Sequence, residues 1–169
     1  MIGDYIIYVG EDKDFSDRWL LKIIHRQTNL PVVLFGPGKK NIKLVKMPVL
    51  AVNRLYTSAI SRHGKENVKE LVKILTHLEE KKIPLINSTL GYSIDTDRNK
   101  QFTFFRDRQL PYVQVSKVNS VLNGRESIDF PCVLKTNPSG RNKTLEIIDK
   151  KEKLSLIPSI VRKNSVLQP

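Results

Sequence analysis

Cysteine is nearly absent from this chain of 169 residues, since Cys132 is its only example. One thiol can form no internal disulfide and cannot by itself build a cysteine zinc site, so the chain fits a reducing compartment. Long hydrophobic runs are absent too, whereas a membrane-spanning helix needs ~18 or more mostly apolar residues. The amino terminus has an acid before its apolar stretch and no small-residue cleavage site, unlike a secretory signal. We therefore expect a cytoplasmic protein that does not enter a membrane.

Acidic residues are few relative to basic ones, 17 against 29, which gives a formal net charge of +12. This excess is compatible with binding to nucleic acid, to an acidic membrane face or to a polyphosphate, and alone it selects none of them. The bases cluster at residues 39–46 and 141–153, and the last acid is Glu152. Aromatic residues, 7% of the chain, lie mostly at apolar helical positions, which disfavours a base-stacking platform. A basic nucleic-acid-binding α/β module therefore remains the alternative hypothesis.

Short apolar segments alternate with amphipathic ones over residues 1–95. One helix is predicted at 15–27 and another at 64–82, where apolar residues recur at helical spacing. The first of these helices would bury Phe15, Trp19, Ile23 and Ile24. Strands are predicted at residues 5–9, 31–35, 48–52 and 83–86. Strands that alternate with helices are typical of a parallel sheet, so we predict a Rossmann-like α/β domain.

Residues 96–169 have a different pattern, in which strands are joined by turns. A helix is predicted at 96–110, followed by Pro111 as a stop. A further short helix is expected near 152–161, interrupted by Pro158. Strands are predicted at residues 112–115, 130–135 and 144–148. The second domain is therefore predicted to be a small α+β lobe with an antiparallel sheet.

Lys135 is the most informative candidate, because it ends an apolar strand and precedes the polar loop 136–143. A lysine fixed at a strand end, facing a loop rich in N–H donors, hydroxyls and basic groups, suits a polyphosphate; a solvated lysine is the alternative. Lys100, near the start of the predicted helix 96–110, would matter only if the fold brought it to the same place. Asn53 and Arg54 follow a predicted strand, where open α/β sheets bind ligands, although a structural cap is equally compatible.

The order and spacing of several segments resemble the ATP-grasp superfamily, and most of all its RimK-like, glutamate-ligase-like branch of carboxylate–amine ligases. The segments are Lys82-Ile83-Pro84-Leu85-Ile86-Asn87-Ser88, then Asn99-Lys100 at a helix start, then Leu110-Pro111-Tyr112-Val113, then Phe130-Pro131-Cys132-Val133-Leu134-Lys135. The closing segment 164–169 is similar to the hinge strand of that family, whose backbone meets adenine. Two departures are Asn99 in place of the family's Asp, and one glycine, Gly140, in its glycine-rich loop.

The resemblance implies a preATP-grasp domain at 1–95 and the first ATP-grasp lobe at 96–169. ATP would be bound through Lys100 and Lys135 on the phosphates, through the covering loop of Ser139, Gly140 and Arg141, and through Leu167 and Gln168 at the hinge. Asn53 and Arg54 would contact the acceptor substrate.

The same resemblance implies a ligase that phosphorylates a carboxylate with ATP and transfers the acyl group from the acyl phosphate to an amine. Its substrates would be small molecules, a peptide or a protein tail. The family's Mg²⁺ carboxylates belong to a lobe that would follow residue 169. We therefore expect the chain to be a fragment or a truncated relative, containing no catalytic residue or metal ligand and inactive alone.

Overall fold

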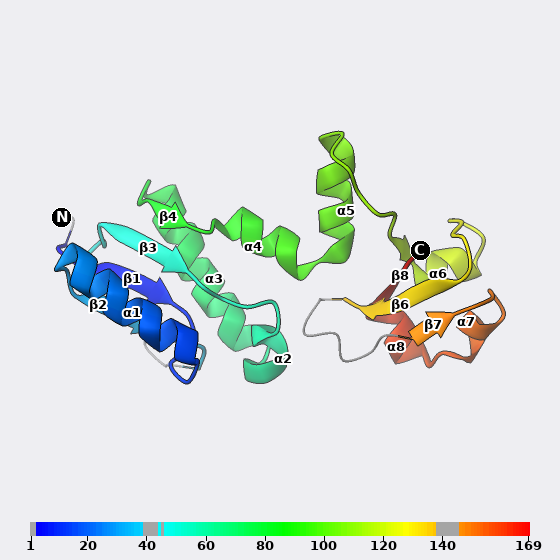
Figure 1. The fold of residues 1–169 in the computed structure, drawn as a ribbon, viewed down its shortest axis with the longest axis horizontal. Coiled ribbons are helices and arrows are strands. Elements are labelled where there is room, and N and C mark those ends of the chain that lie inside the picture. Colours follow the sequence, from blue (N-terminus) through cyan, green and yellow to red (C-terminus); the bar gives the residue numbers. More distant parts are fainter. Residues whose placement is uncertain (1–2, 39–43, 45, 138–145) are drawn as a thin grey trace. The chain divides into compact units, whose positions relative to one another are not determined.

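The computed structural model describes residues 3–38, 44, 46–137 and 146–169, and the chain divides into two compact units, Met1–Tyr92 and Ser93–Pro169 (Figure 1). In the first unit the strands are β1 (Ile6–Val9), β2 (Val32–Phe35), β3 (Leu50–Asn53) and β4 (Leu85–Ile86). They form one sheet in the order β2-β1-β3-β4, and each neighbouring pair is parallel. The predicted parallel α/β sheet is confirmed.

Helices cover both faces of this sheet. Side chains alternate between the two faces of a strand, so Ile7 and Val9 point to one side of β1 and Ile6 and Tyr8 to the other. Ile7 and Val9 pack against α3 (Lys65–Glu80), which buries Val68, Leu71, Leu75 and Leu78 as its spacing predicts. The opposite face packs against Leu20, Leu21 and Ile24 of α1 (Phe15–Thr28). The other helices that begin in this unit are α2 (Ala59–His63) and α4 (Thr89–Thr96).

The predicted buried face of α1 is wrong at two positions. Phe15 is 77% exposed and Trp19 is 54% exposed, whereas the helix packs through Leu20, Leu21 and Ile24. The helix starts at the cap Asp14, whose carboxylate accepts a hydrogen bond from the Asp17 N–H at 3.1 Å. Asp17 is itself buried, so the face that turns inward is set by this acid and its neighbours as well as by apolar side chains.

The second unit contains an antiparallel sheet in the order β5-β8-β6-β7. The strands are β5 (Ser116–Lys117), β6 (Cys132–Thr136), β7 (Glu146–Ile148) and β8 (Ser165–Gln168). Its helices are α5 (Arg98–Asp107), α6 (Val118–Leu122), α7 (Lys153–Leu156) and α8 (Ser159–Lys163). Pro158 lies at the start of α8 and separates it from α7, as predicted.

One face of this second sheet is covered by helices, and the other, called the polar face below, carries Lys135 and Gln168 as well as Val133 and the buried Val166. Cys132, Leu134, Ile148 and Leu167 pack with Val118 and Val121 of α6 and with Leu154 of α7. Leu134 pairs with Leu167, and Lys135 with Val166. Because side chains alternate, Lys135 and Gln168 project from the face opposite to the helix-covered core.

Two sequence predictions differ from this unit. The predicted helix 96–110 is shorter, since α4 ends at Thr96 and α5 spans Arg98–Asp107, with Asp97 extended between them. The predicted strand 112–115 does not form, because pairing with β8 begins only at Ser116. Tyr112 and Val113 remain about half exposed, which removes the packing that a strand of this length requires.

Candidate functional site

The polar face of the second sheet brings Lys135 and Gln168 together. Their strands are antiparallel neighbours, and the Lys135 ammonium donates a hydrogen bond to the Gln168 side-chain oxygen. The predicted pair of a phosphate-binding lysine and a hinge glutamine is therefore a contact pair. Leu167 directly precedes Gln168, but its side chain is buried in the core on the helix-covered face. Any ligand contact of Leu167 on the polar face would use its backbone.

A second cation lies near Lys135. Burial lowers the pKa of Lys135 below the ordinary lysine value, and the positive charge of Arg98 lowers it further. Arg98 is the first residue of α5, and its Nε is buried without a hydrogen-bond partner among the described residues. Two cations that repel each other, one with an unsatisfied donor, form a site whose electrostatic complement is an anion.

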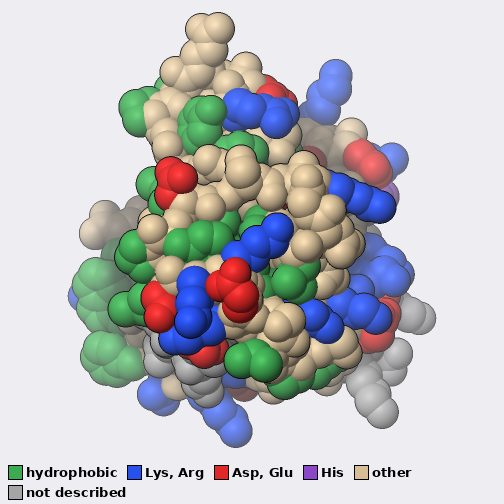
Figure 2. All heavy atoms as spheres, turned by 90° about the vertical axis from the view of Figure 1, so that its right-hand side faces the viewer, with side chains coloured by type: hydrophobic (Ala, Val, Ile, Leu, Met, Phe, Trp, Pro, Cys, Tyr) green, Lys and Arg blue, Asp and Glu red, His purple; other side chains and the backbone are tan. Residues whose placement is uncertain are grey.

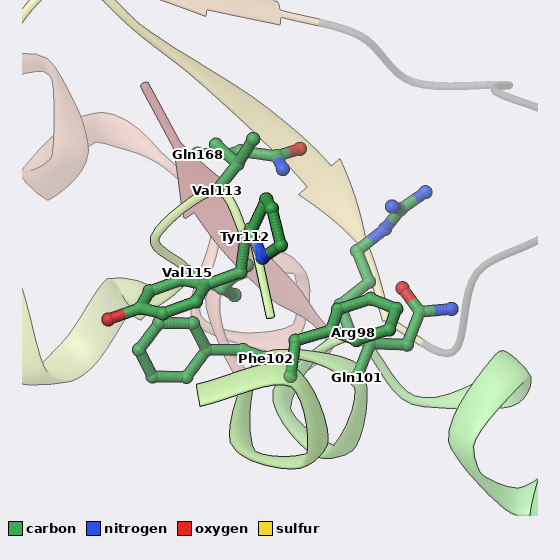
Figure 3. Close-up of a pocket in the computed structure, with 9 residues that line it drawn as sticks. Arg98, Gln101, Phe102, Tyr112, Val113, Val115 and Gln168 are labelled. Atoms are coloured by element: carbon green, nitrogen blue, oxygen red, sulfur yellow. The ribbon is translucent and has the colours of Figure 1, made fainter. Parts of the chain in front are cut away.

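A pocket of about 400 Å³ opens beside these groups (Figure 3). Arg98 and Gln168 line it together, while Phe102 and Tyr112 supply an apolar wall in which their rings meet edge to face at 5.1 Å between centroids. The remaining lining residues are Gln101, Phe105, Pro111, Val113 and Val115. An apolar slot with a cation and amides at its rim has the composition of a small-molecule binding site.

Asp97 and Asn137 connect α5 to the end of β6. The Asn137 side chain donates to the Asp97 carboxylate at 2.9 Å, and its oxygen accepts from the Arg98 N–H at 3.0 Å. Although burial alone would raise it, hydrogen bonds from Asn137 and from the N–H groups of Asn99 and Lys100 hold the pKa of Asp97 below its ordinary value. This ionised cap holds the start of α5, and with it Arg98, beside the strand that carries Lys135.

Neither Lys100 nor Lys135 is part of the described lining of this pocket, but Lys135 binds its lining residue Gln168 and Lys100 does not. The Lys100 ammonium donates to the Ser93 hydroxyl at 2.5 Å, and its side chain is exposed. The structure thus places Arg98, and not Lys100, beside Lys135, while the role expected for Lys100 stays a prediction. Ser139, Gly140 and Arg141, the expected covering loop, lie outside the described residues, as do Lys39, Lys40 and Lys43 of the first basic cluster.

Asn53 and Arg54 follow β3 in the first unit. The Asn53 side chain is 3% exposed, and its oxygen accepts from the Leu55 N–H at 3.1 Å, as a structural cap does. The Arg54 guanidinium approaches the buried Asp17 at 3.4 Å and donates to the Tyr56 hydroxyl at 2.6 Å. Its side chain keeps 32% of its surface exposed, so only Arg54 of this pair presents a group to a ligand.

The Asp17 carboxylate is the centre of this cluster. It accepts from the Tyr8 hydroxyl at 2.7 Å and from the Glu11 N–H at 2.7 Å. Burial first, and Asp17 second, raise the pKa of Tyr8 above its ordinary value. A Cβ on Gly10 would lie 2.6 Å from an Asp17 carboxylate oxygen, so only glycine fits at the end of β1.

Sequence reasoning missed Arg98, Gln101 and the Asp97–Asn137 link. Arg98 directly precedes Asn99-Lys100, and its position as the first helical residue after the capping acid Asp97 was a usable signal. Asn137 gave no signal, because its partner lies 40 residues earlier in the chain.

Comparisons with known proteins show which solved structures share this fold. No protein-family model and no curated protein sequence matches the chain. Solved structures do match. A RimK domain ATP-grasp protein from Sphaerobacter thermophilus superposes with a TM-score of 0.63 at 15% identity, covering 96% of this chain and 62% of that one. The ATP-grasp ligase PsnB, complexed with a minimal precursor, gives 0.60 at 14% identity, covering 98% and 64%.

A third match is N5-carboxyaminoimidazole ribonucleotide synthetase from Thermus thermophilus, with a TM-score of 0.58 at 19% identity. It covers 99% of this chain and 46% of that one. The chain thus has the fold of ATP-grasp ligases, with a parallel α/β unit followed by an α+β lobe. It spans less than two thirds of the length of the ATP-grasp structures it matches.

Two further observations bear on cofactors and membranes. In residues 3–38, 44, 46–137 and 146–169, no group of three or more His, Cys, Asp or Glu side chains could hold a metal ion. Over the same ranges, none of the helices combines the length and the apolar character needed to cross a bilayer.

Proposed function

We propose that this chain forms the nucleotide-binding part of an ATP-dependent carboxylate–amine ligase that works through an acyl phosphate. The observation that carries the proposal is an apolar pocket lined by Arg98 and Gln168, with Lys135 bound to Gln168 and influenced by the charge of Arg98. Its location on the polar face of the antiparallel lobe, within an ATP-grasp fold, supports ATP as the ligand. Preorganised cations of this kind stabilise the charge that spreads over a phosphoryl group during transfer.

Different side chains would bind different parts of the nucleotide. Lys135 and Arg98 would hold the phosphates, joined by Lys100 and by the loop of Ser139, Gly140 and Arg141. Phe102 and Tyr112 would face the base, with Gln168 and the backbone of Leu167 at its polar edge. ATP supplies the phosphoryl group that activates the carboxylate, whereas this chain's residues bind and orient it. The unsatisfied Arg98 Nε supports the fit, since a phosphate oxygen would satisfy it.

The Mg²⁺ expected with ATP does not fit the described residues of this chain, because they offer no cluster of metal ligands. The matched ATP-grasp structures extend beyond the part that this chain covers. We propose that turnover, the metal and most substrate contacts need that remaining part. PsnB has been solved with a precursor peptide, and here a peptide, a protein tail or a small molecule is proposed as the carboxylate or amine substrate, with Arg54 as its contact in the first unit.

The test is a calorimetric titration of the 169-residue chain with a non-hydrolysable ATP analogue in the absence of Mg²⁺. We expect saturable binding that Lys135→Ala weakens by about tenfold or more, the loss typical of a hydrogen bond to a charged group. Lys151→Ala, which removes an exposed lysine of the same unit, should leave the affinity unchanged.

Equal affinity in both variants would overturn the assignment of the nucleotide to this pocket. Salt-sensitive binding of a random oligonucleotide, indifferent to Lys135→Ala, would instead support the nucleic-acid module. The face drawn in Figure 2 shows Lys and Arg side chains together with fewer Asp and Glu side chains.

A further inference from the structure

A second cavity, of about 210 Å³, lies in the second unit. Ser165 of β8 lines it, and Ser165 projects from the same face as Leu167, the helix-covered face of the sheet. Lys135 and Gln168 project from the opposite face. The linings of the two pockets share no residue, so the second cavity is a separate site.

Three cationic residues line this second cavity: Lys117 at the end of β5, and Arg162 and Lys163 at the end of α8. Lys117 pairs with Val166, as Lys135 does, so its side chain leaves the sheet on the face of Lys135, and Arg162 and Lys163 are the cations on the side of the cavity. No carboxylate is part of its described lining, and in the described part of the chain none of the three cations makes an ion pair. Two acids that contact its lining residues are engaged in other bonds: Glu126 accepts from the Lys117 N–H at 3.0 Å, and Asp97 is held by Asn137. The cavity therefore keeps an excess of positive charge.

The donors of the cavity are also incompletely satisfied. The Arg162 Nε is buried and has no hydrogen-bond partner among the described residues, which is costly for a charged donor. The side-chain amide of Asn119 and the hydroxyl of Ser120 line the same space. An oxyanion with several acceptor oxygens would satisfy the Arg162 donor and the neighbouring groups at once, in charge-assisted hydrogen bonds.

We propose that this cavity binds a phosphate group, either as inorganic phosphate or as part of a small phosphorylated molecule. A dianion with acceptor oxygens in tetrahedral arrangement matches the two cations of α8 and the polar lining residues Asn119 and Ser120. The volume exceeds the ~10–15 Å³ that a single water needs, and it leaves room for a short carbon skeleton on the phosphate. The cavity shares no lining residue with the proposed nucleotide pocket, although its lining residue Asn137 also binds the Arg98 N–H, and the phosphate proposal would remain if the ligase assignment failed.

The test titrates the 169-residue chain with inorganic phosphate and, separately, with glycerol 3-phosphate, followed by NMR shifts of the backbone amides. We expect saturable binding, with shifts concentrated at Asn119, Ser120 and residues 162–165. Arg162→Gln and Lys163→Gln should each weaken it by about tenfold. Lys163 is exposed, so its variant keeps the test valid if Arg162→Gln fails to fold. If glycerol 3-phosphate binds more tightly than inorganic phosphate, the ligand is a small phosphorylated molecule. If the two bind equally, the ligand is inorganic phosphate.

Two matched controls distinguish binding at this cavity from a general effect of positive charge. Lys151→Gln removes the same charge from an exposed position and should change nothing. Lys135→Ala should also leave phosphate binding intact, because it alters only the opposite face. The proposal is overturned if binding is absent, if it survives in both the Arg162 and Lys163 variants, or if Lys135→Ala abolishes it. It is equally overturned if a random oligonucleotide displaces phosphate with a steep salt dependence, which would indicate a nucleic-acid surface.

Discussion

One cluster of cations in each unit shows a difference between the two units. In the first unit the cations of the cluster have acids: Arg54, after β3, approaches Asp17, and Arg62 and His63 of α2 both bind Glu11. In the second unit, Arg98 and Lys135 lie near each other, and Lys135 binds the Gln168 side-chain amide instead of an acid. A cluster whose cations are neutralised by acids stabilises its own fold. A cluster whose cations have no acid partner can bind an anionic ligand. This difference explains why nucleotide binding is proposed for the second unit.

The pKa directions agree with this contrast. Although burial alone would raise it, hydrogen bonds from Arg62 and His63 hold the pKa of Glu11 below its ordinary value. Lys135 shows the opposite case of a cation made less basic by burial and by a like charge. The first pattern marks an internally satisfied network, and the second marks a perturbed group bound to the pocket residue Gln168, as is common at functional sites.

The largest expected effect comes from Asp17→Ala. This variant removes a fully buried carboxylate and leaves the Tyr8 hydroxyl and the Glu11 N–H without their acceptor. We expect a loss of about 3 kcal/mol in the free energy of unfolding of the first unit. Hydrogen exchange at the amides of β1 measures it, and nucleotide affinity should stay within about twofold of wild type wherever the chain remains folded.

The control for that variant is Glu66→Ala, which breaks the exposed ion pair with Lys69 at 3.7 Å. Exposed pairs contribute little, so β1 exchange should not change. If Asp17→Ala proved as harmless as Glu66→Ala, the first cluster would not be a stabilising network, and the contrast between the units would fail.

Arg98→Ala should have the next largest effect, this time on binding. It removes the cation that lines the pocket, so we expect nucleotide affinity to fall by about tenfold with little change in stability. Arg125→Ala, an exposed arginine of the same unit, is the matched control and should bind as wild type does. Calorimetry with the ATP analogue distinguishes them, and equal affinities would remove Arg98 from the site.

Asn137→Ala tests the link between α5 and β6, and its effect should be smaller. Loss of the two side-chain hydrogen bonds would let the start of α5 drift, weakening nucleotide binding by about fivefold. The pKa of Asp97 should rise, since one of its donors is gone. The stability that Asp97 contributes is present above its ordinary pKa and is lost as pH falls through the lowered, folded value. Acid unfolding of the variant should therefore begin at higher pH, as near-UV circular dichroism would measure.

Much of the fold was predictable because its signals are local. The apolar spacing of α3, the strand that carries Lys135 and the interruption at Pro158 depend on neighbours within a few residues. Only part of the candidate nucleotide site could be predicted from the sequence. Lys135 and Gln168 followed from a resemblance in spacing, whereas Arg98 becomes a partner of Lys135 through an antiparallel sheet and a link between Asp97 and Asn137. Such contacts join residues that are 40 positions apart and produce no periodic pattern in the sequence.

The smallest expected effect is on the pH dependence of nucleotide affinity, which separates the two causes that lower the pKa of Lys135. Burial first, and the charge of Arg98 second, lower its pKa, and phosphate binding needs the ammonium form. Nucleotide affinity should thus decline at lower pH than it would for a solvated lysine near ~10.4. Arg98→Gln removes the like charge, so the decline should move to higher pH while the affinity at neutral pH falls.

The contribution of Lys135 to the stability of the fold changes with pH in the opposite direction to nucleotide affinity. The lowered pKa of Lys135 opposes protonation in the native state, so the stability from Lys135 rises as pH increases through the folded pKa toward the unfolded value. Nitrogen NMR of the Lys135 amine measures the pKa directly in the wild type and in Arg98→Gln. An identical titration in both proteins would mean that Arg98 does not act on Lys135, and the second unit would then lack the uncompensated pair of cations that sets it apart from the first.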